Sequence, residues 1–269
     1  MAAPPARYAG TRVPRVEDTR LLTGHGTFVD DVTRPGMLHA CFVRSPFAHA
    51  RINGIDAAAA LALPGVRAVF TAADLNPDVR EAWHAVAGKD VPDTPRPPLA
   101  DGEVKFVGDP VALVVADSRY IAEDAIELVD VDYEPLPAVA DFTTAVGAEV
   151  AVHEAYPDNV AGGLAGAPPD EEVFAAAAHV VKERIYQQAY VPVPMETRGL
   201  VVEWVASTEE LTMWASTQTP HELRAFAARL LGIPAQRVRV VMRDTGGGFG
   251  QKVVPMREDM CIMLAARKV

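Results

Sequence analysis

The sequence predicts an α+β protein built from two domains. At about 150 residues per domain, a chain of 269 residues has room for two cores. Strand-like alternation and amphipathic helical patterns follow one another along the chain, and two segments rich in proline and glycine interrupt them. Apolar residues make up 49% of the chain and charged residues 23%, which is typical of a folded protein and excludes wholesale disorder.

In the first half, β-branched and alternating segments predict strands, and alanine-rich or capped segments predict helices. Ser118 is placed to cap a helix. Residues 76–102 hold many prolines and predict a long exposed loop. The segment 111–133 reads as strand, helix and strand, and this unit can be parallel with a right-handed crossover. The expected strands are 37–44, 66–70, 111–116 and 129–133, and the expected helices are 56–63 and 119–129.

After a second proline- and glycine-rich segment, the pattern starts again. Thr219, Pro220 and Glu222 predict a helix start with a capping box, and Gly232 predicts the end of that helix. A stripe of Met260, Met263 and Leu264 predicts a last helix. The other expected elements are a helix at 171–180, strands at 181–190 and 237–242, and a hairpin of 200–205 with 211–215.

Charge and cysteine content narrow the class of protein. There are 36 acidic and 25 basic residues, giving a net charge of −11 with no basic run. This argues against nucleic acid or an anionic membrane as the main partner. We find no apolar stretch long enough for a membrane span and no secretory signal in residues 1–19, which read as an N-terminal arm. Two cysteines without a pairing framework favour the reduced cytoplasm.

The most informative segment is 244–252 (DTGGGFGQK), which directly follows a predicted strand. Three consecutive glycines leave the backbone unobstructed, so several amides can point at one anion or oxo group. Gln218 lies just outside a helix N-terminus, where an electron-rich ligand is favoured. Taken alone, the glycines can equally form a simple turn. The segment matches neither GxGxxG nor GxxxxGK[ST], so the pattern itself does not predict a nucleotide site.

Several motifs resemble one known family. Residues 216–218 (STQ) followed by a capped helix, a strand and 246–252 (GGGFGQK) are similar to the large subunit of the molybdenum hydroxylases, the family of xanthine dehydrogenase, aldehyde oxidase and aerobic carbon monoxide dehydrogenase. Further motifs of this resemblance are 44–50 (RSPFAHA), 107–111 (VGDPV) and 194–196 (PME). The resemblance implies an α/β-hammerhead domain at 20–141, a linker at 142–170 and part of a molybdopterin-binding domain at 171–269.

The resemblance also implies a site. The amide of Gln218 and the backbone amide of Phe249 would face the oxygen ligands of molybdenum, with the glycine loop close to the pterin. The implied cofactor-binding residues are Gln218, Gly246, Gly247, Gly248, Phe249 and Gly250. None of them ligates the metal, because the pterin dithiolene holds it. No residue of this chain is expected to be the catalytic base, which the family carries further along its chain.

The implied reaction is hydroxylation of a small molecule with water as the oxygen source. The implied cofactor is molybdenum–molybdopterin in its cytosine dinucleotide form, and separate iron–sulfur and FAD subunits would carry the electrons. The purine-oxidising branch has a glutamate after the lysine of the glycine motif, but this chain has Val253. The resemblance therefore favours an aldehyde, a heterocycle or carbon monoxide. Glu196 either faces the site or accepts hydrogen bonds within its loop.

Because family large subunits are much longer, we expect this chain to be truncated at Val269 and to need a further polypeptide with the rest of the molybdopterin domain. The isolated chain is then expected to be inactive. Two alternatives stay open. One is a non-catalytic remnant or assembly partner of such a complex, and the other is a free-standing protein that binds an anion or nucleotide through the glycine loop.

Overall fold

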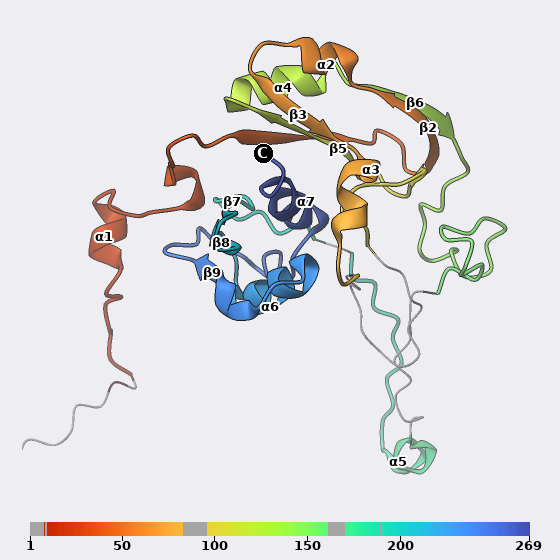
Figure 1. Cartoon of the computed structure of the whole chain (residues 1–269). Helices are drawn as coiled ribbons and strands as arrows, with labels where there is room; N and C mark the ends of the chain where they lie inside the picture. The colour runs from red at the N-terminus through yellow and green to blue at the C-terminus, as the bar shows by residue number, and fades with distance from the viewer. Residues whose placement is uncertain (1–7, 9, 83–95, 161–169, 189) are drawn as a thin grey trace, which may run out of the picture.

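The computed structural model describes residues 8, 10–82, 96–160, 170–188 and 190–269. Figure 1 shows two bodies of secondary structure, one from the first half of the chain and one from the second, with the last helix between them. We call residues 39–135 the N-terminal half and residues 200–269 the C-terminal half. In the described part of the chain, we find no helix that is both long and apolar enough to cross a membrane.

Two antiparallel three-stranded sheets build the N-terminal half. The strand orders are β1-β5-β3 and β4-β2-β6. Strand β5 is buried at every residue, which suits its central place and its apolar sequence. The strands are β1 (His39–Arg44), β2 (Ala50–Asp56), β3 (Val66–Phe70), β4 (Glu103–Val104), β5 (Pro110–Ala116) and β6 (Asp130–Pro135), and the helices are α2 (Ala58–Ala62), α3 (Ala72–Leu75) and α4 (Arg119–Ile126).

The predicted strands and helices of this half are present, although α4 ends at Ile126 rather than at residue 129, and β2, β4 and α3 were not predicted. The Ser118 cap is confirmed, because its hydroxyl accepts a hydrogen bond from the Ile121 N–H. The predicted parallel unit over 111–133 is wrong. Strands β5 and β6 belong to different sheets, and β6 pairs antiparallel with β2. Asp130 and Asp132 are exposed on one face of β6, so this half-polar strand suits the edge of an antiparallel sheet.

The C-terminal half contains the parallel unit instead. Strand β7 (Leu200–Val205) and strand β8 (Glu210–Ala215) form the predicted antiparallel hairpin. Helix α6 (Pro220–Leu231) then leads to β9 (Val238–Val241), which pairs parallel with β8. Gly232 ends α6 in the left-handed conformation, as predicted. The predicted capping box is wrong, because the Thr219 hydroxyl donates to the Val253 carbonyl oxygen at 2.5 Å rather than capping the helix.

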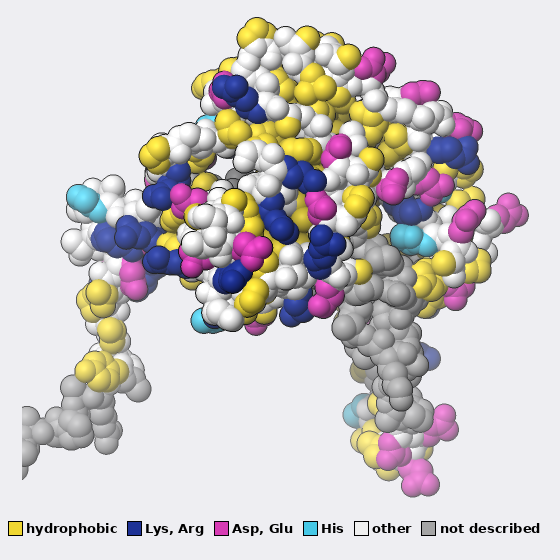
Figure 2. All heavy atoms as spheres, viewed as in Figure 1, with side chains coloured by type: hydrophobic (Ala, Val, Ile, Leu, Met, Phe, Trp, Pro, Cys, Tyr) yellow, Lys and Arg dark blue, Asp and Glu magenta, His cyan; other side chains and the backbone are white. Residues whose placement is uncertain are grey.

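Two proline-rich or extended segments also differ from expectation. Residues 76–102 are not a wholly exposed loop: Leu99 is completely buried, while 83–95 lie outside the described residues. Helix α5 (Glu171–Ala176) ends earlier than predicted, and the described residues of 181–190 form no strand. Ile185 is 87% exposed there, because no described strand pairs with this segment. Figure 2 shows that the tip near α5 stands away from the body, with acidic side chains.

The remaining elements are short. Helix α1 (Asp18–Leu22) lies at the end of the predicted arm, of which 1–7 and 9 are outside the described residues. The described residues also form three 3-10 turns, at Val29–Asp31, Asn76–Asp78 and Ala235–Arg237.

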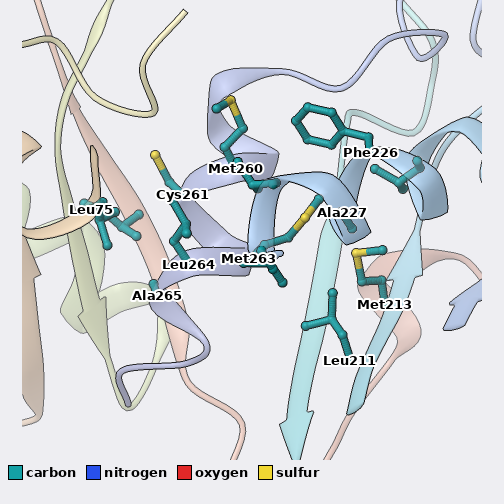
Figure 3. Packing of buried hydrophobic residues seen from close by; sticks show 14 of the residues in the cluster. Leu75, Leu211, Met213, Phe226, Ala227, Met260, Cys261, Met263, Leu264 and Ala265 are labelled. Atoms are coloured by element: carbon teal, nitrogen blue, oxygen red, sulfur yellow. The ribbon is translucent and has the colours of Figure 1, made fainter. Parts of the chain in front are cut away.

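Helix α7 (Arg257–Ala265) packs both halves into one hydrophobic core. In Figure 3, Met263 and Leu264 of α7 lie between Leu75 on one side and Phe226 on the other. The same cluster includes Leu113 of β5 and Leu211 of β8, so it spans both halves. Each fully buried aliphatic side chain stabilises the fold by about 1.5–3 kcal/mol. This shared core therefore sets how the halves sit against one another.

Polar contacts at the start of α7 add to this packing. Arg257 donates to the Pro97 carbonyl oxygen at 2.6 Å and forms an ion pair with Asp109. Arg44 of β1 donates to Glu258 at 2.7 Å. These bonds join the N-terminal half to the start of α7, which follows the glycine loop (residues 244–252) after four residues. The far end of that loop is therefore attached to the main body of the protein.

Leu264→Ala tests the role of α7. Leu264 is 1% exposed, so its truncation should lower the free energy of unfolding by about 2–5 kcal/mol. Urea denaturation of the whole chain measures this loss. Leu22→Ala is the matched control, because Leu22 is 86% exposed, and its effect should stay within about 0.5 kcal/mol. Equal effects of the two substitutions would contradict the shared core.

Candidate functional site

The glycine loop, residues 244–252, connects β9 to the segment before α7 and packs closely against two side chains. A Cβ on Gly246 would lie 2.5 Å from the Glu196 Cβ atom. A Cβ on Gly248 would lie 2.4 Å from the Gln218 Oε1 atom. Only Gly247 of the three consecutive glycines has a positive φ, 97°. Close approach therefore explains Gly246 and Gly248, whereas backbone freedom explains Gly247.

Gln218 lies directly on this loop. Its side-chain oxygen accepts hydrogen bonds from the N–H groups of Gly250, at 3.1 Å, and Lys252, at 3.2 Å. Its own backbone N–H donates to the Lys252 carbonyl oxygen at 2.9 Å. Because both side-chain partners are N–H donors, the atom facing them is the oxygen. The Gln218 amide nitrogen is left free to donate, with no hydrogen-bond partner among the described residues.

The backbone amides of the loop fall into two groups. The Gly246 N–H donates to Glu196 at 2.7 Å, and the Gly250 N–H is taken by Gln218. Within the described structure, the N–H groups of Thr245, Gly247, Gly248 and Phe249 have no hydrogen-bond acceptor, and neither has the buried Thr245 hydroxyl. Phe249 holds a left-handed backbone, with φ of 52°, and its ring is 73% exposed. Residues 247–249 thus carry three consecutive amides without an acceptor in the protein, an arrangement that can bind an anion or oxo group.

Glu196 takes the second of its two predicted roles, that of an acceptor within the fold. Its carboxylate accepts from the Ser216 hydroxyl at 2.6 Å, the Gly246 N–H at 2.7 Å and the Val29 N–H at 3.2 Å, and it lies 3.3 Å from Lys252 Nζ. Burial by itself raises the pKa of Glu196. The Ser216 hydroxyl, the two N–H groups and Lys252 outweigh burial and hold that pKa below its ordinary value.

Sequence reasoning missed the burial of Lys252. Its side chain is completely buried, and its ammonium group contacts Glu196 and Ser216. The sequence feature that could have indicated this is the position of the lysine inside the glycine motif. A lysine is rarely buried without a partner, so a buried Lys252 requires acceptors nearby. The motif alone did not show which acceptors surround it.

A segment near the N-terminus lies along the start of the loop, which the sequence also did not indicate. Arg20 donates two hydrogen bonds of 2.6 Å to Asp244, and the Thr27 N–H donates to the same carboxylate at 2.7 Å. The Arg20 guanidinium, followed by the Thr27 N–H, lowers the pKa of Asp244 to about 2, against a smaller opposing effect of burial.

Beside this contact is a cleft of about 280 Å³ lined by Phe28, Trp214 and other residues.

The chemistry of the site is that of hydrogen-bond donation. No group of three or more His, Cys, Asp or Glu side chains in the described part of the chain is placed to hold a metal ion. Among the described residues, the donors of the site without partners are the Gln218 amide nitrogen, the N–H groups of Thr245, Gly247, Gly248 and Phe249, and the buried Thr245 hydroxyl. Such donors bind the oxygen atoms of an anion or of an oxo group.

Comparison with known proteins identifies the family. Residues 23–137 match the model described as "Aldehyde oxidase and xanthine dehydrogenase, a/b hammerhead domain", and residues 152–269 match the "Molybdopterin cofactor-binding domain". The chain belongs to the molybdenum hydroxylase family. The expected resemblance and fold class, a hammerhead domain followed by a molybdopterin-binding domain of mixed helices and sheets, are confirmed.

Several relatives of this chain are named as large subunits or large chains. The nicotine 6-hydroxylase large subunit of Paenarthrobacter nicotinovorans is 42% identical over 96% of this chain and 32% of its own length. The carbon monoxide dehydrogenase large chain of Hydrogenophaga pseudoflava is 39% identical over 93% of this chain and 32% of its own length. The crystal structure of quinoline 2-oxidoreductase from Pseudomonas putida 86 matches with a TM-score of 0.84 and 41% identity, over 96% of this chain and 33% of that chain. The chain therefore spans about a third of these relatives.

Gly246→Ala tests the close packing of the loop. The new Cβ would meet the Glu196 Cβ and lie 3.1 Å from its backbone nitrogen, so the free energy of unfolding should fall by about 1–3 kcal/mol. Thermal unfolding followed by circular dichroism measures the change. At Gly54 a Cβ meets no heavy atom within 4 Å, so Gly54→Ala is the control and should change stability little. A loop that tolerates both substitutions equally would contradict this packing.

Asp244→Asn tests the contact with Arg20 through its pH dependence. The pKa of Asp244 falls from 3.8 to about 2 on folding, so the ionised carboxylate stabilises the fold above pH 3.8, and this contribution is lost as the pH falls through about 2. The urea midpoint of the variant should be below wild type at neutral pH, and the gap should narrow in acid. Exposed Asp101→Asn should show no such gap. A gap that is constant with pH would exclude this role for Asp244.

Proposed function

We propose that this chain forms the first part of the molybdopterin-binding large subunit of a molybdenum hydroxylase, and that its glycine loop and Gln218 hold the cofactor. The observation that supports this most is a group of donors without partners in the described structure, which includes the Gln218 amide nitrogen and the N–H groups of Gly247, Gly248 and Phe249. Gly246 and Gly250 belong to the same site through their contacts with Glu196 and Gln218. The proposed pterin is the cytosine dinucleotide form.

The donor set fits a group that presents oxygen atoms. It contains no thiolate or imidazole, which agrees with a metal held by the pterin dithiolene rather than by protein side chains. When bound, molybdenum–molybdopterin supplies hydroxylation chemistry in which water is the oxygen source. The residues of this chain bind and orient that group. A preorganised donor in such a site contributes about a hundredfold or more to the rate.

Glu196 does not serve as the base in this proposal. One oxygen of its carboxylate accepts from Ser216, Gly246 and Lys252, and the other accepts from Val29. These bonds leave it poorly placed to take a proton from a substrate. We place the catalytic base on a polypeptide that corresponds to the rest of the large subunit.

The proposed substrate is an aromatic nitrogen heterocycle. The relatives named for nicotine and quinoline are 42% and 41% identical to this chain, while the xanthine dehydrogenase molybdenum-binding subunit of Escherichia coli O157:H7 is 31% identical. Val253 after Lys252 also argues against a purine. Carbon monoxide is the second candidate, because carbon monoxide dehydrogenase large chains are 39% identical.

The proposed assembly contains an iron–sulfur subunit and an FAD subunit in addition to the rest of the large subunit, and it acts in the cytoplasm. One relative, 37% identical, is named subunit gamma of the 6-hydroxypseudooxynicotine dehydrogenase complex. That name supports a multi-subunit enzyme for this chain as well.

Co-purification of the chain with the products of its neighbouring genes tests the proposal. We expect the assembled complex to contain molybdenum, measured by mass spectrometry, and a released pterin that carries cytidine monophosphate. The complex should hydroxylate a pyridine or quinoline ring, and turnover of carbon monoxide would instead support the second candidate. An assembled complex that contains this chain but no molybdenum would refute the proposed function.

Gln218→Ala tests the donor role within that complex. We expect turnover to fall about a hundredfold, because the freely donating amide nitrogen is removed. Gln251→Ala is the matched control, since it lies in the same loop and its side chain has no recorded hydrogen bond in the described structure. Turnover of the control should stay within about threefold of wild type. Similar losses in both variants would mean that Gln218 has no specific role.

A further inference from the structure

We propose that the buried ammonium group of Lys252 is a positioning group: together with Ser216 and Glu196 it holds the glycine loop in its ligand-ready conformation before any ligand binds. We call these three residues the buried clasp. The inference concerns the loop itself, and it rests on the proposed function only for what the loop then binds.

The Lys252 ammonium has a full set of acceptors. Its Nζ atom lies 2.8 Å from the Glu196 carbonyl oxygen, 2.7 Å from the Ser216 Oγ atom and 3.3 Å from the Glu196 Oε2 atom. An ammonium group has three N–H donors, and three acceptors surround it. The Lys252 side chain is 0% exposed and that of Glu196 is 13% exposed. Removing either charge would therefore leave the other one buried and uncompensated.

The buried clasp contacts the glycine loop near its start, at Gly246, and at its end, at Lys252. At the start of the loop, the Glu196 carboxylate accepts from the Gly246 N–H, and the Glu196 N–H donates back to the Gly246 carbonyl oxygen at 3.2 Å. At its end, the Lys252 side chain enters the same cluster. The amides at 247–249, which have no partners in the described structure, lie between these two fixed points. The ion pair therefore determines how those amides are presented.

Ser216 connects the same cluster to Gln218. Its hydroxyl donates to the Glu196 carboxylate at 2.6 Å and accepts from the Lys252 ammonium at 2.7 Å. Ser216 is 5% exposed and lies two residues before Gln218. One buried network thus fixes the loop and the segment that carries the free amide nitrogen. Both sets of donors are oriented together, so little reorganisation is needed when a ligand binds.

Lys252→Met provides a test that does not depend on any ligand. Without its cation, the Glu196 carboxylate is less stabilised in the charged form, so its pKa should rise. Protonation would then weaken its bond with the Gly246 N–H. The loop of the variant should become sensitive to mild acid, while the wild-type loop should not. A purely hydrophobic role for the Lys252 side chain would produce no such pH dependence.

The Gly246 amide can be observed selectively. The chain contains two Thr–Gly pairs, Thr23–Gly24 and Thr245–Gly246. Labelling threonine carbonyls with carbon-13 and glycine nitrogens with nitrogen-15 therefore leaves two amide signals, those of Gly24 and Gly246, in a carbonyl-filtered NMR spectrum. Gly24 precedes His25, whose imidazole can change charge in this pH range, so chemical shifts are referenced to an added standard. We expect the wild-type Gly246 signal to be constant from pH 8 to pH 5. In Lys252→Met it should titrate, and its hydrogen exchange should rise about tenfold or more.

Lys105→Met is the matched control, because Lys105 also pairs with a glutamate, Glu103, at 2.8 Å, but away from the loop. It should leave Gly246 unchanged. If Lys252→Met does not fold, the double variant Lys252→Met/Glu196→Gln removes both charges and avoids an unpaired one. Its Gly246 signal should be shifted from wild type yet independent of pH.

A Gly246 signal identical to wild type in Lys252→Met, or in the double variant, would overturn the clasp. That result would leave the molybdenum proposal intact, because no ligand is present in this experiment. Conversely, a complex without molybdenum would refute the proposed function and leave the clasp standing.

Discussion

The carboxylate of Glu196 is the point on which the site depends. It accepts hydrogen bonds from three groups far apart in the chain, which are the Val29 N–H, the Ser216 hydroxyl and the Gly246 N–H. It also lies beside the buried Lys252 ammonium. A buried charge is tolerated only when paired and hydrogen-bonded. This requirement brings the N-terminal segment, the end of β8 and the glycine loop to one place.

The position of the loop also follows from the shared core. The loop leads into α7, whose Met263 and Leu264 pack between the two halves, and whose Arg257 bonds to Asp109 and Pro97. The buried clasp and the packing of α7 therefore both resist deformation of the loop. A site built on such anchored elements presents its donors with little freedom, which suits the binding of a rigid, oxygen-rich group.

Local patterns predicted most of the elements because the formation of those strands and helices depends on residues close together in the sequence. Strand β5 and the end of α6 at Gly232 follow from hydrophobic runs and a helix-stopping glycine. The failures concern partners distant in sequence. Segment 181–190 has strand-like alternation, but no strand lies beside it in the described structure. The Thr219 hydroxyl donates to the Val253 carbonyl oxygen and does not cap its own helix.

The sequence by itself determined the family, the order of most strands and helices, and the candidate residues Gln218 and Phe249, since these depend on short motifs and local periodicity. Only the tertiary structure decided which loop amides are free, that Glu196 is an internal acceptor, and that Lys252 is buried. Hydrogen bonding and burial depend on groups that are far apart in the chain, such as Arg20 and Asp244, which are 224 residues apart. No pattern read along the chain specifies which of those groups will meet.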